Sequence, residues 1–197
     1  VVSGLLRALM GPLSGTAIFE GRSCLKDKLG ERIGSTAFTL LDDPLIPRAL
    51  GSHPHDGDGL PAQRRAIVDG GVLKMFFLSV YNSRRLKMPG TTGGASNVVI
   101  PPGDRSPMAL AAERGRVIRV DGFLGGNSNA STGDFSFGIQ GALLEDGKPV
   151  RALSEMNISG DLFGLLERYT EAADDTWTHG SWRTPSLLFD DIQFSGA

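Results

Sequence analysis

Cysteine and histidine are scarce in this sequence. Its 197 residues include one cysteine, Cys24, and three histidines. A single cysteine excludes an intrachain disulfide framework, which suits a reducing compartment, so we expect a cytoplasmic protein. The three histidines leave few side chains from which a histidine-rich metal site could be built.

Long apolar runs and an excess of charge of one sign are also missing. No run approaches the roughly 18 apolar residues that a membrane-spanning helix needs. The 20 basic and 22 acidic residues give a net charge of -2, so no strong global field attracts phosphate backbones. We therefore expect neither membrane association nor direct binding of nucleic acid.

Common catalytic signatures are absent as well. The sequence has no nucleophile elbow, no phosphate-binding loop of the Walker type and no dinucleotide-binding fingerprint. Residues 23–26 have the Ser-x-x-Lys spelling of penicillin-recognising enzymes, but the accompanying Ser-Asp-Asn and Lys-Thr-Gly elements are missing. Cys24 is interpreted as a buried thiol in preference to a nucleophile.

Two groups of residues have a composition that a ligand site could use. Residues 53–58 contain His53 and His55, which would point to the same side of a strand as a metal pair could. Their richness in Pro, Gly and Asp favours a solvated turn. The aromatic cluster at residues 177–182 is interpreted as side chains that pack in the fold or line the rim of a pocket, in preference to a cofactor site.

The sequence is rich in glycine and proline, which end helices and strands. Its 27 glycines and 11 prolines are spread along the chain, as in folds with many short strands and turns. We predict one α+β domain over residues 1–197, with a mainly antiparallel sheet or a barrel-like β core and about three short helices. Because the chain opens on an apolar stretch without an initiator Met, we expect a fragment. Residues 1–15 would be the end of an entering helix, and an N-terminal domain would be missing.

Several elements can be placed from local signals. Ser106 before Pro107 and Asp161 before Leu162 are N-cap signals for two helices. Helices are predicted over residues 5–10, 107–113 and 162–169, and one or two helical turns over residues 80–86. Strands are predicted over residues 16–20, 37–41, 75–78, 187–189 and 192–194, and residues 66–73 are predicted to form a hairpin that turns at Asp69-Gly70.

Residues 131–160 form the most informative stretch. They predict an extended segment, a turn at Asp146-Gly147 and a return strand that ends at Ser159-Gly160. Their order also resembles the C-terminal domain of the TldD/PmbA family of metallopeptidase-like proteins. Six ordered matches of compatible spacing support that resemblance, at residues 13–15, 72–86, 92–93, 133–136, 158–162 and 186–188.

The resemblance also indicates which branch of the family the chain is similar to. Active TldD-like members carry His-Glu-x-x-x-His on the helix before the Leu-x-Gly segment, where the histidines hold zinc and the glutamate acts as general base. Leu6, Arg7 and Gly11 occupy these positions here, and no C-terminal cysteine ligand is present. This pattern resembles the PmbA/TldE branch and implies no catalytic residue, no metal ligand and no cofactor in this chain, with zinc only in a TldD-like partner.

The resemblance implies a subunit of a TldD/TldE-type metalloprotease complex that acts on unfolded peptides, as a homodimer or as a heterodimer with a TldD-like subunit. Whether the chain is itself an enzyme stays open. The alternatives are a divergent active metallopeptidase and a non-proteolytic, protein-binding modulator of the DNA gyrase type. Glycine-rich loops could let a peptide or partner approach the backbone, and the candidate contacts are Thr91, Gly93, Gly94, Thr132, Gly133 and Asp134.

Overall fold

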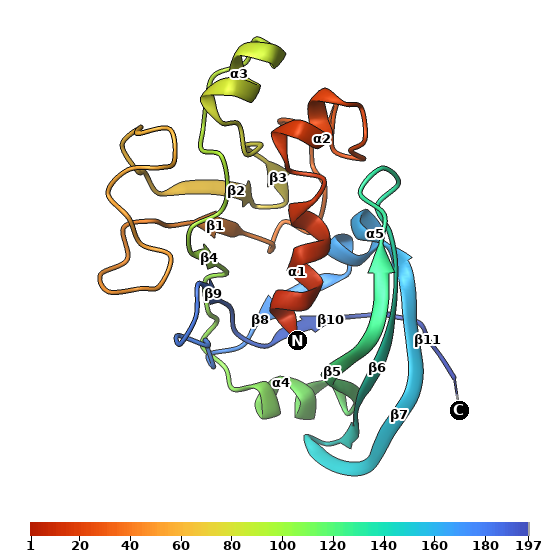
Figure 1. Ribbon diagram of the computed structural model, residues 1–197. Coiled ribbons are helices and arrows are strands. Elements are labelled where there is room, and N and C mark those ends of the chain that lie inside the picture. Colours follow the sequence, from red (N-terminus) through yellow and green to blue (C-terminus); the bar gives the residue numbers. More distant parts are fainter. Residues whose placement is uncertain (197) are drawn as a thin grey trace.

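Residues 1–196 are described by a computed structural model with five helices and eleven strands (Figure 1). The helices are α1 (Val2–Met10), α2 (Gly15–Phe19), α3 (Val80–Leu86), α4 (Pro107–Arg114) and α5 (Leu162–Glu167). The strands are β1 (Leu40–Asp42), β2 (Arg65–Asp69), β3 (Val72–Leu73), β4 (Val98–Val99), β5 (Arg116–Ser128), β6 (Asp134–Glu145), β7 (Lys148–Asp161), β8 (Tyr169–Ala172), β9 (Trp182–Arg183), β10 (Leu187–Phe189) and β11 (Phe194–Ser195).

The longest elements form one curved antiparallel meander, at the right of Figure 1. Strands β5, β6 and β7 pair in sequence and β11 adds to β7, so the order is β11-β7-β6-β5. The turn between β6 and β7 lies at Asp146 and Gly147, whose φ angles of 48° and 76° suit a tight turn. The extended segment and turn predicted within residues 131–160 are thus confirmed.

A five-stranded sheet of short strands occupies the other side of α1, with the order β3-β2-β1-β4-β9. Its pairs are antiparallel except β4 with β9, which run parallel. A separate two-stranded sheet joins β8 to β10. The α+β, mainly antiparallel prediction is confirmed. The structure has five helices, and over residues 1–196 none of the sheets closes into a barrel.

Two large hydrophobic clusters hold these layers together, and a small third one contains Ala111 of α4 and Ala142 and Leu144 of β6. The larger one packs under the five-stranded sheet and includes Phe38, Leu40 and Phe76, each at most 2% exposed. The second lies against the meander and contains Ala8 of α1, Phe135 and Ile139 of β6 and residues of α5. Helix α1 contributes to both clusters because its buried residues are Leu6, Ala8 and Leu9. It therefore joins the two halves of the fold.

The predicted helix starts are confirmed by side-chain caps. The Ser106 hydroxyl accepts a hydrogen bond from the backbone N–H of Ala109, and the Asp161 carboxylate accepts one from Gly164. Helix α3 is capped in the same way by Ser79. Each cap satisfies a backbone donor that has no partner within its helix.

Several strand predictions were wrong. Residues 16–19 lie in helix α2 and Glu20 is its C-cap, because a helical turn buries Ile18 while the N–H of Gly15 donates to Phe77. Residues 75–78 are buried as expected but make only an isolated bridge, at Phe77, since they fill the core beneath the sheet. The strand predicted at 37–41 begins later, at Leu40, and that at 192–194 pairs only from Phe194.

The longest helix described has nine residues. Within residues 1–196, no helix combines the length and the apolar character that crossing a membrane requires.

Candidate functional site

The site to test is the face of α1 on which the family resemblance places zinc ligands. Leu6 points into the core and is 3% exposed, whereas the next residue, Arg7, is exposed. Gly11 caps the C-terminal end of α1 and is exposed close to Ala130. A one-residue step along a helix turns the side chain by about 100°, so Leu6 and Arg7 face different surroundings.

Arg7 has a specific partner in the last third of the chain. Its guanidinium carbon lies 5.2 Å from the centre of the Trp182 ring, within the range of a cation–π interaction. Trp182 begins β9, which pairs with β4 at the edge of the five-stranded sheet. The Arg7 contact thus connects α1 to the segment in which the resemblance seeks the C-terminal metal ligand.

None of the three histidines is part of this contact. His179 is exposed and packs edge-on against Trp177 at a ring distance of 4.9 Å. The Nδ1 of His53 contacts the carbonyl of Gly51, and the residues around His55 form an exposed turn in which Asp56 accepts backbone N–H groups. The solvated turn predicted for residues 53–58 is therefore present.

A cavity of about 1390 Å³ opens between the start of α1, strand β5 and the C-terminal segment. Apolar side chains of Ile118, Val120 and Phe123 line the β5 side, and Trp182 and Phe189 line the other. Ligand sites are typically concave and mostly apolar, so this cavity has the shape of a binding groove.

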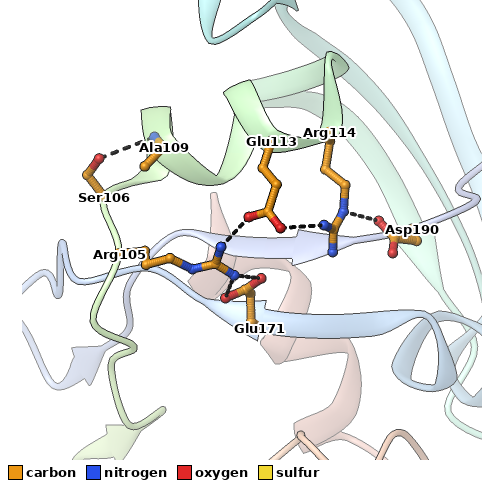
Figure 2. Close-up of polar contacts among 7 residues, drawn as sticks. All are labelled: Arg105, Ser106, Ala109, Glu113, Arg114, Glu171 and Asp190. Carbon is orange, nitrogen blue, oxygen red and sulfur yellow. Dashed lines mark hydrogen bonds and ion pairs between the residues drawn. The ribbon is translucent and has the colours of Figure 1, made fainter.

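Figure 2 shows an ion-pair network, of which Arg114 and Asp190 line this cavity and form part of its rim. Arg105 donates to both oxygens of the Glu171 carboxylate at 2.5 and 2.6 Å and also to Glu113 of α4. Arg114 of the same helix donates to Asp190 at 3.2 Å. The network ties α4 to β8 and to the residue after β10, which holds the rim in one arrangement.

The first group of candidate contacts follows α3. The hydroxyl of Thr91 accepts from the N–H of Leu78 and donates to the carbonyl of Phe76, so it is engaged inside the fold. Gly93 and Gly94 are exposed, and an added side chain at Gly94 would meet open space. Of these residues, the two glycines are the ones whose backbone another chain could reach.

The second group forms the turn between β5 and β6. Gly133 has a φ of 86° and is buried, with its carbonyl accepting from Leu162 at 3.0 Å. The exposed Thr132 accepts from the N–H of Asp134 through its hydroxyl. Within residues 1–196 no hydrogen bond joins this turn to Thr91, Gly93 or Gly94, so the structure does not gather the candidate contacts into one site.

Cys24 lies beside the same turn and is half-buried. Burial raises the pKa of its thiol, a backbone hydrogen bond offsets part of that rise, and the carboxylates of Asp134 and Asp161 add to it. Since the thiolate is the reactive form, a raised pKa makes Cys24 a poor nucleophile at neutral pH.

Comparisons with known proteins identify the family. The sequence profile of the PmbA/TldA metallopeptidase C-terminal domain matches residues 1–196. This chain belongs to that family. A metalloprotease PmbA homologue of Haemophilus influenzae is 30% identical over 199 residues, covering all of this chain and 44% of that relative.

Solved structures of the PmbA/TldA family agree with this fold. A protein of Bacteroides thetaiotaomicron named as a modulator of DNA gyrase is 40% identical, with a TM-score of 0.95 over 99% of this chain and 45% of that one. TldE of Thermococcus kodakarensis is 26% identical, with a TM-score of 0.90 over 100% of this chain and 48% of that one. The chain spans less than half the length of these relatives.

A metallopeptidase family implies a metal ion, but the residues at this site do not fit one. Leu6 and Gly11 offer no lone pair, and the permanent positive charge of Arg7 would repel a cation. In the part of the chain that the structure describes, no three His, Cys, Asp or Glu side chains lie close enough together to hold a metal. No zinc-dependent step is therefore assigned to residues of this chain.

The sequence indicates the α1 positions but not which residue Arg7 contacts. Trp182 is a sequence signal for this contact, because tryptophan is the ring on which cations pack best, but the sequence does not show which cation it meets. Neither the rim network nor the cavity was predicted, because both depend on bringing α4, β8 and the C-terminal segment together in space.

Proposed function

We propose that this domain belongs to a PmbA/TldE-like subunit that is non-catalytic itself and pairs with a TldD-like subunit in a cytoplasmic metalloprotease complex. The complex would act on unfolded peptides, and the zinc would be held by the TldD-like subunit alone. The contribution of this chain would be structural, as part of the wall around a shared peptide-binding space.

The observation that carries this proposal is the contact of Arg7 with Trp182. At the position that the resemblance gives to the catalytic glutamate, the chain has a cation, and that cation packs on an aromatic ring. A general base must accept a proton, and a guanidinium that is always protonated cannot do so. The contact suits a structural role, since it joins α1 to β9.

The test uses the full-length protein that contains this chain, purified alone and after co-expression with the TldD-like protein of the same genome. Zinc is measured by mass spectrometry, and cleavage of unfolded casein is measured with and without a chelator. We expect the protein alone to carry no stoichiometric zinc and to leave casein intact. The co-expressed pair should elute together with about one zinc ion per pair and show chelator-sensitive cleavage.

The matched control is a pair in which the first histidine of the partner's His-Glu-x-x-x-His motif is replaced by alanine. That pair should still form but lose zinc and activity. Stoichiometric zinc with chelator-sensitive cleavage by the full-length protein alone would overturn the proposal in favour of a divergent metallopeptidase. Failure to recover the TldD-like protein, with DNA gyrase recovered in its place, would favour a modulator.

A further inference from the structure

A compact group of aromatic and cationic side chains lies on α2 and α3, far from α1's contact with Trp182. We call Phe19, Tyr81, Arg84, Arg85 and Lys87 the α2–α3 patch. Phe19 ends α2, and the other four lie on α3 or directly after it. Figure 1 shows the two helices next to each other at the top of the molecule.

Arg85 is held between two rings. Its guanidinium carbon lies 3.4 Å from the centre of the Phe19 ring and 5.1 Å from that of Tyr81. Stacking of this kind leaves the edge of the guanidinium, with its N–H donors, free to point outward. Because the side chain is already ordered, less conformational entropy is lost when a partner binds it.

The cations of the patch have no counter-ion in the fold. Within residues 1–196, no ion pair includes Arg84, Arg85 or Lys87. Asp58 lines the same shallow hollow, but its Oδ2 accepts the N–H of Val80 at 2.8 Å and so caps the helix. The patch therefore presents three positive charges against one carboxylate that is already engaged.

Helix electrostatics explain only part of this arrangement. Positive side chains near the end of α3 compensate the negative end of the helix dipole. The dipole does not explain why Tyr81 is 65% and Phe19 40% exposed beside them. Exposed tyrosine and arginine together are the composition of protein-interface hot spots.

We propose that the α2–α3 patch is a docking site for a protein segment that presents side-chain carboxylates. Arg84 and Arg85 would donate to the carboxylates, with Arg85 oriented by Phe19 and Tyr81, and Lys87 would add long-range attraction. The charge of the patch favours an acidic partner, because the groups of Arg84, Arg85 and Lys87 that are unpaired within residues 1–196 are N–H donors that carry positive charge. The proposal does not depend on the absence of zinc or on the pairing proposed above.

The test measures fluorescence anisotropy of a labelled peptide of about eight glutamates, about 27 Å long when extended, titrated at low salt with the full-length protein that contains this chain. We expect the double variant R84E/R85E to weaken binding at least tenfold. The variant Y81A removes no charge but should weaken binding about threefold by releasing Arg85. The matched control is K148E/R151E on the β6–β7 hairpin, at the opposite end of Figure 1, which makes the same charge change and should bind within about twofold of wild type.

Circular dichroism checks that the variants fold, and R84Q/R85Q gives a milder change should R84E/R85E not fold. Absence of binding at low salt would overturn the proposal. The proposal would also be overturned if K148E/R151E weakened peptide binding as much as R84E/R85E does, or if Y81A left the affinity unchanged. Either result would show diffuse electrostatic attraction and no specific binding site. Tighter binding of a single-stranded DNA of equal charge would assign the patch to nucleic acid instead.

Discussion

The guanidinium carbon of Arg7 lies 5.2 Å from the centre of the Trp182 ring, and this contact connects the first helix of the chain to its ninth strand. The two residues are far apart in sequence, and each belongs to a region that the family resemblance associates with metal ligands. The contact puts a positive charge where a metal centre would need electron-pair donors.

Replacing Arg7 by methionine should weaken the packing of α1 on β9. A cation–π contact at an exposed position contributes about 0.5–1 kcal/mol, so the free energy of unfolding should fall by that amount. Urea denaturation followed by tryptophan fluorescence measures it and also reports the surroundings of Trp182. The control is Arg151→Met, an exposed arginine on β7 without a ring contact. Equal losses in the two variants would show that the ring contributes nothing.

Arg105 and Glu171, whose carboxylate accepts from Nη2 of Arg105 through both oxygens, should be energetically coupled. A double-mutant cycle with Arg105→Ala and Glu171→Gln should show a favourable interaction that becomes smaller at high salt, because the pair is partly exposed and screened. Arg105→Lys should not restore the whole network, since Nη2 of Arg105 donates to Glu171 while Nη1 donates to Glu113, and an ammonium has only one nitrogen. An interaction that is independent of salt would contradict this description of the network.

Two glycines with similar backbone angles should respond very differently to alanine. Gly30 and Gly71 have φ angles of 84° and 77°, but an added methyl at Gly30 meets open space while one at Gly71 overlaps the backbone carbonyl of Gly34. Gly30→Ala should cost about 1 kcal/mol from the left-handed conformation alone. Gly71→Ala should cost about 3 kcal/mol or more. Denaturant unfolding measures the loss of stability in both variants. Equal losses would show that the close approach of Gly71 to the carbonyl of Gly34 contributes nothing.

Asp42 should make stability fall as pH rises in the acidic range. Burial raises the pKa of this carboxyl, and hydrogen bonds from Ser96, with Arg65 and His53 nearby, offset the rise only in part. A folded pKa above the unfolded value of about 3.9 favours the protonated form in the folded state. The resulting stabilisation is complete below that unfolded pKa and is lost as pH rises through the folded pKa.

The variant Asp42→Asn isolates this effect, because it cannot titrate at this position. The free energy of unfolding of wild type minus that of the variant should decrease from about pH 3.5 upward and become constant towards neutral pH. Urea unfolding at a series of pH values measures it. A difference that grows with pH would mean that the bonds from Ser96 outweigh the burial of the charge.

How far the sequence predicts this fold depends on how local each signal is. The caps at Ser106 and Asp161 and the turn at Asp146-Gly147 were found because one or two residues determine them. Residues 16–20 were predicted as a strand, but burial of Ile18 and the bond from Gly15 to Phe77 place residues 16–19 in a helix. Local propensity is a weak preference that tertiary contacts override.

The candidate site shows the same division. The sequence alone determined that Leu6, Arg7 and Gly11 cannot ligate zinc, since that follows from the atoms of their side chains. Only the tertiary structure decided that Arg7 packs on Trp182, that Arg85 lies between Phe19 and Tyr81, and that Thr91 is engaged internally. The physical reason is distance along the chain: side-chain chemistry is a property of each residue, whereas its partner is chosen by the packing of the whole fold.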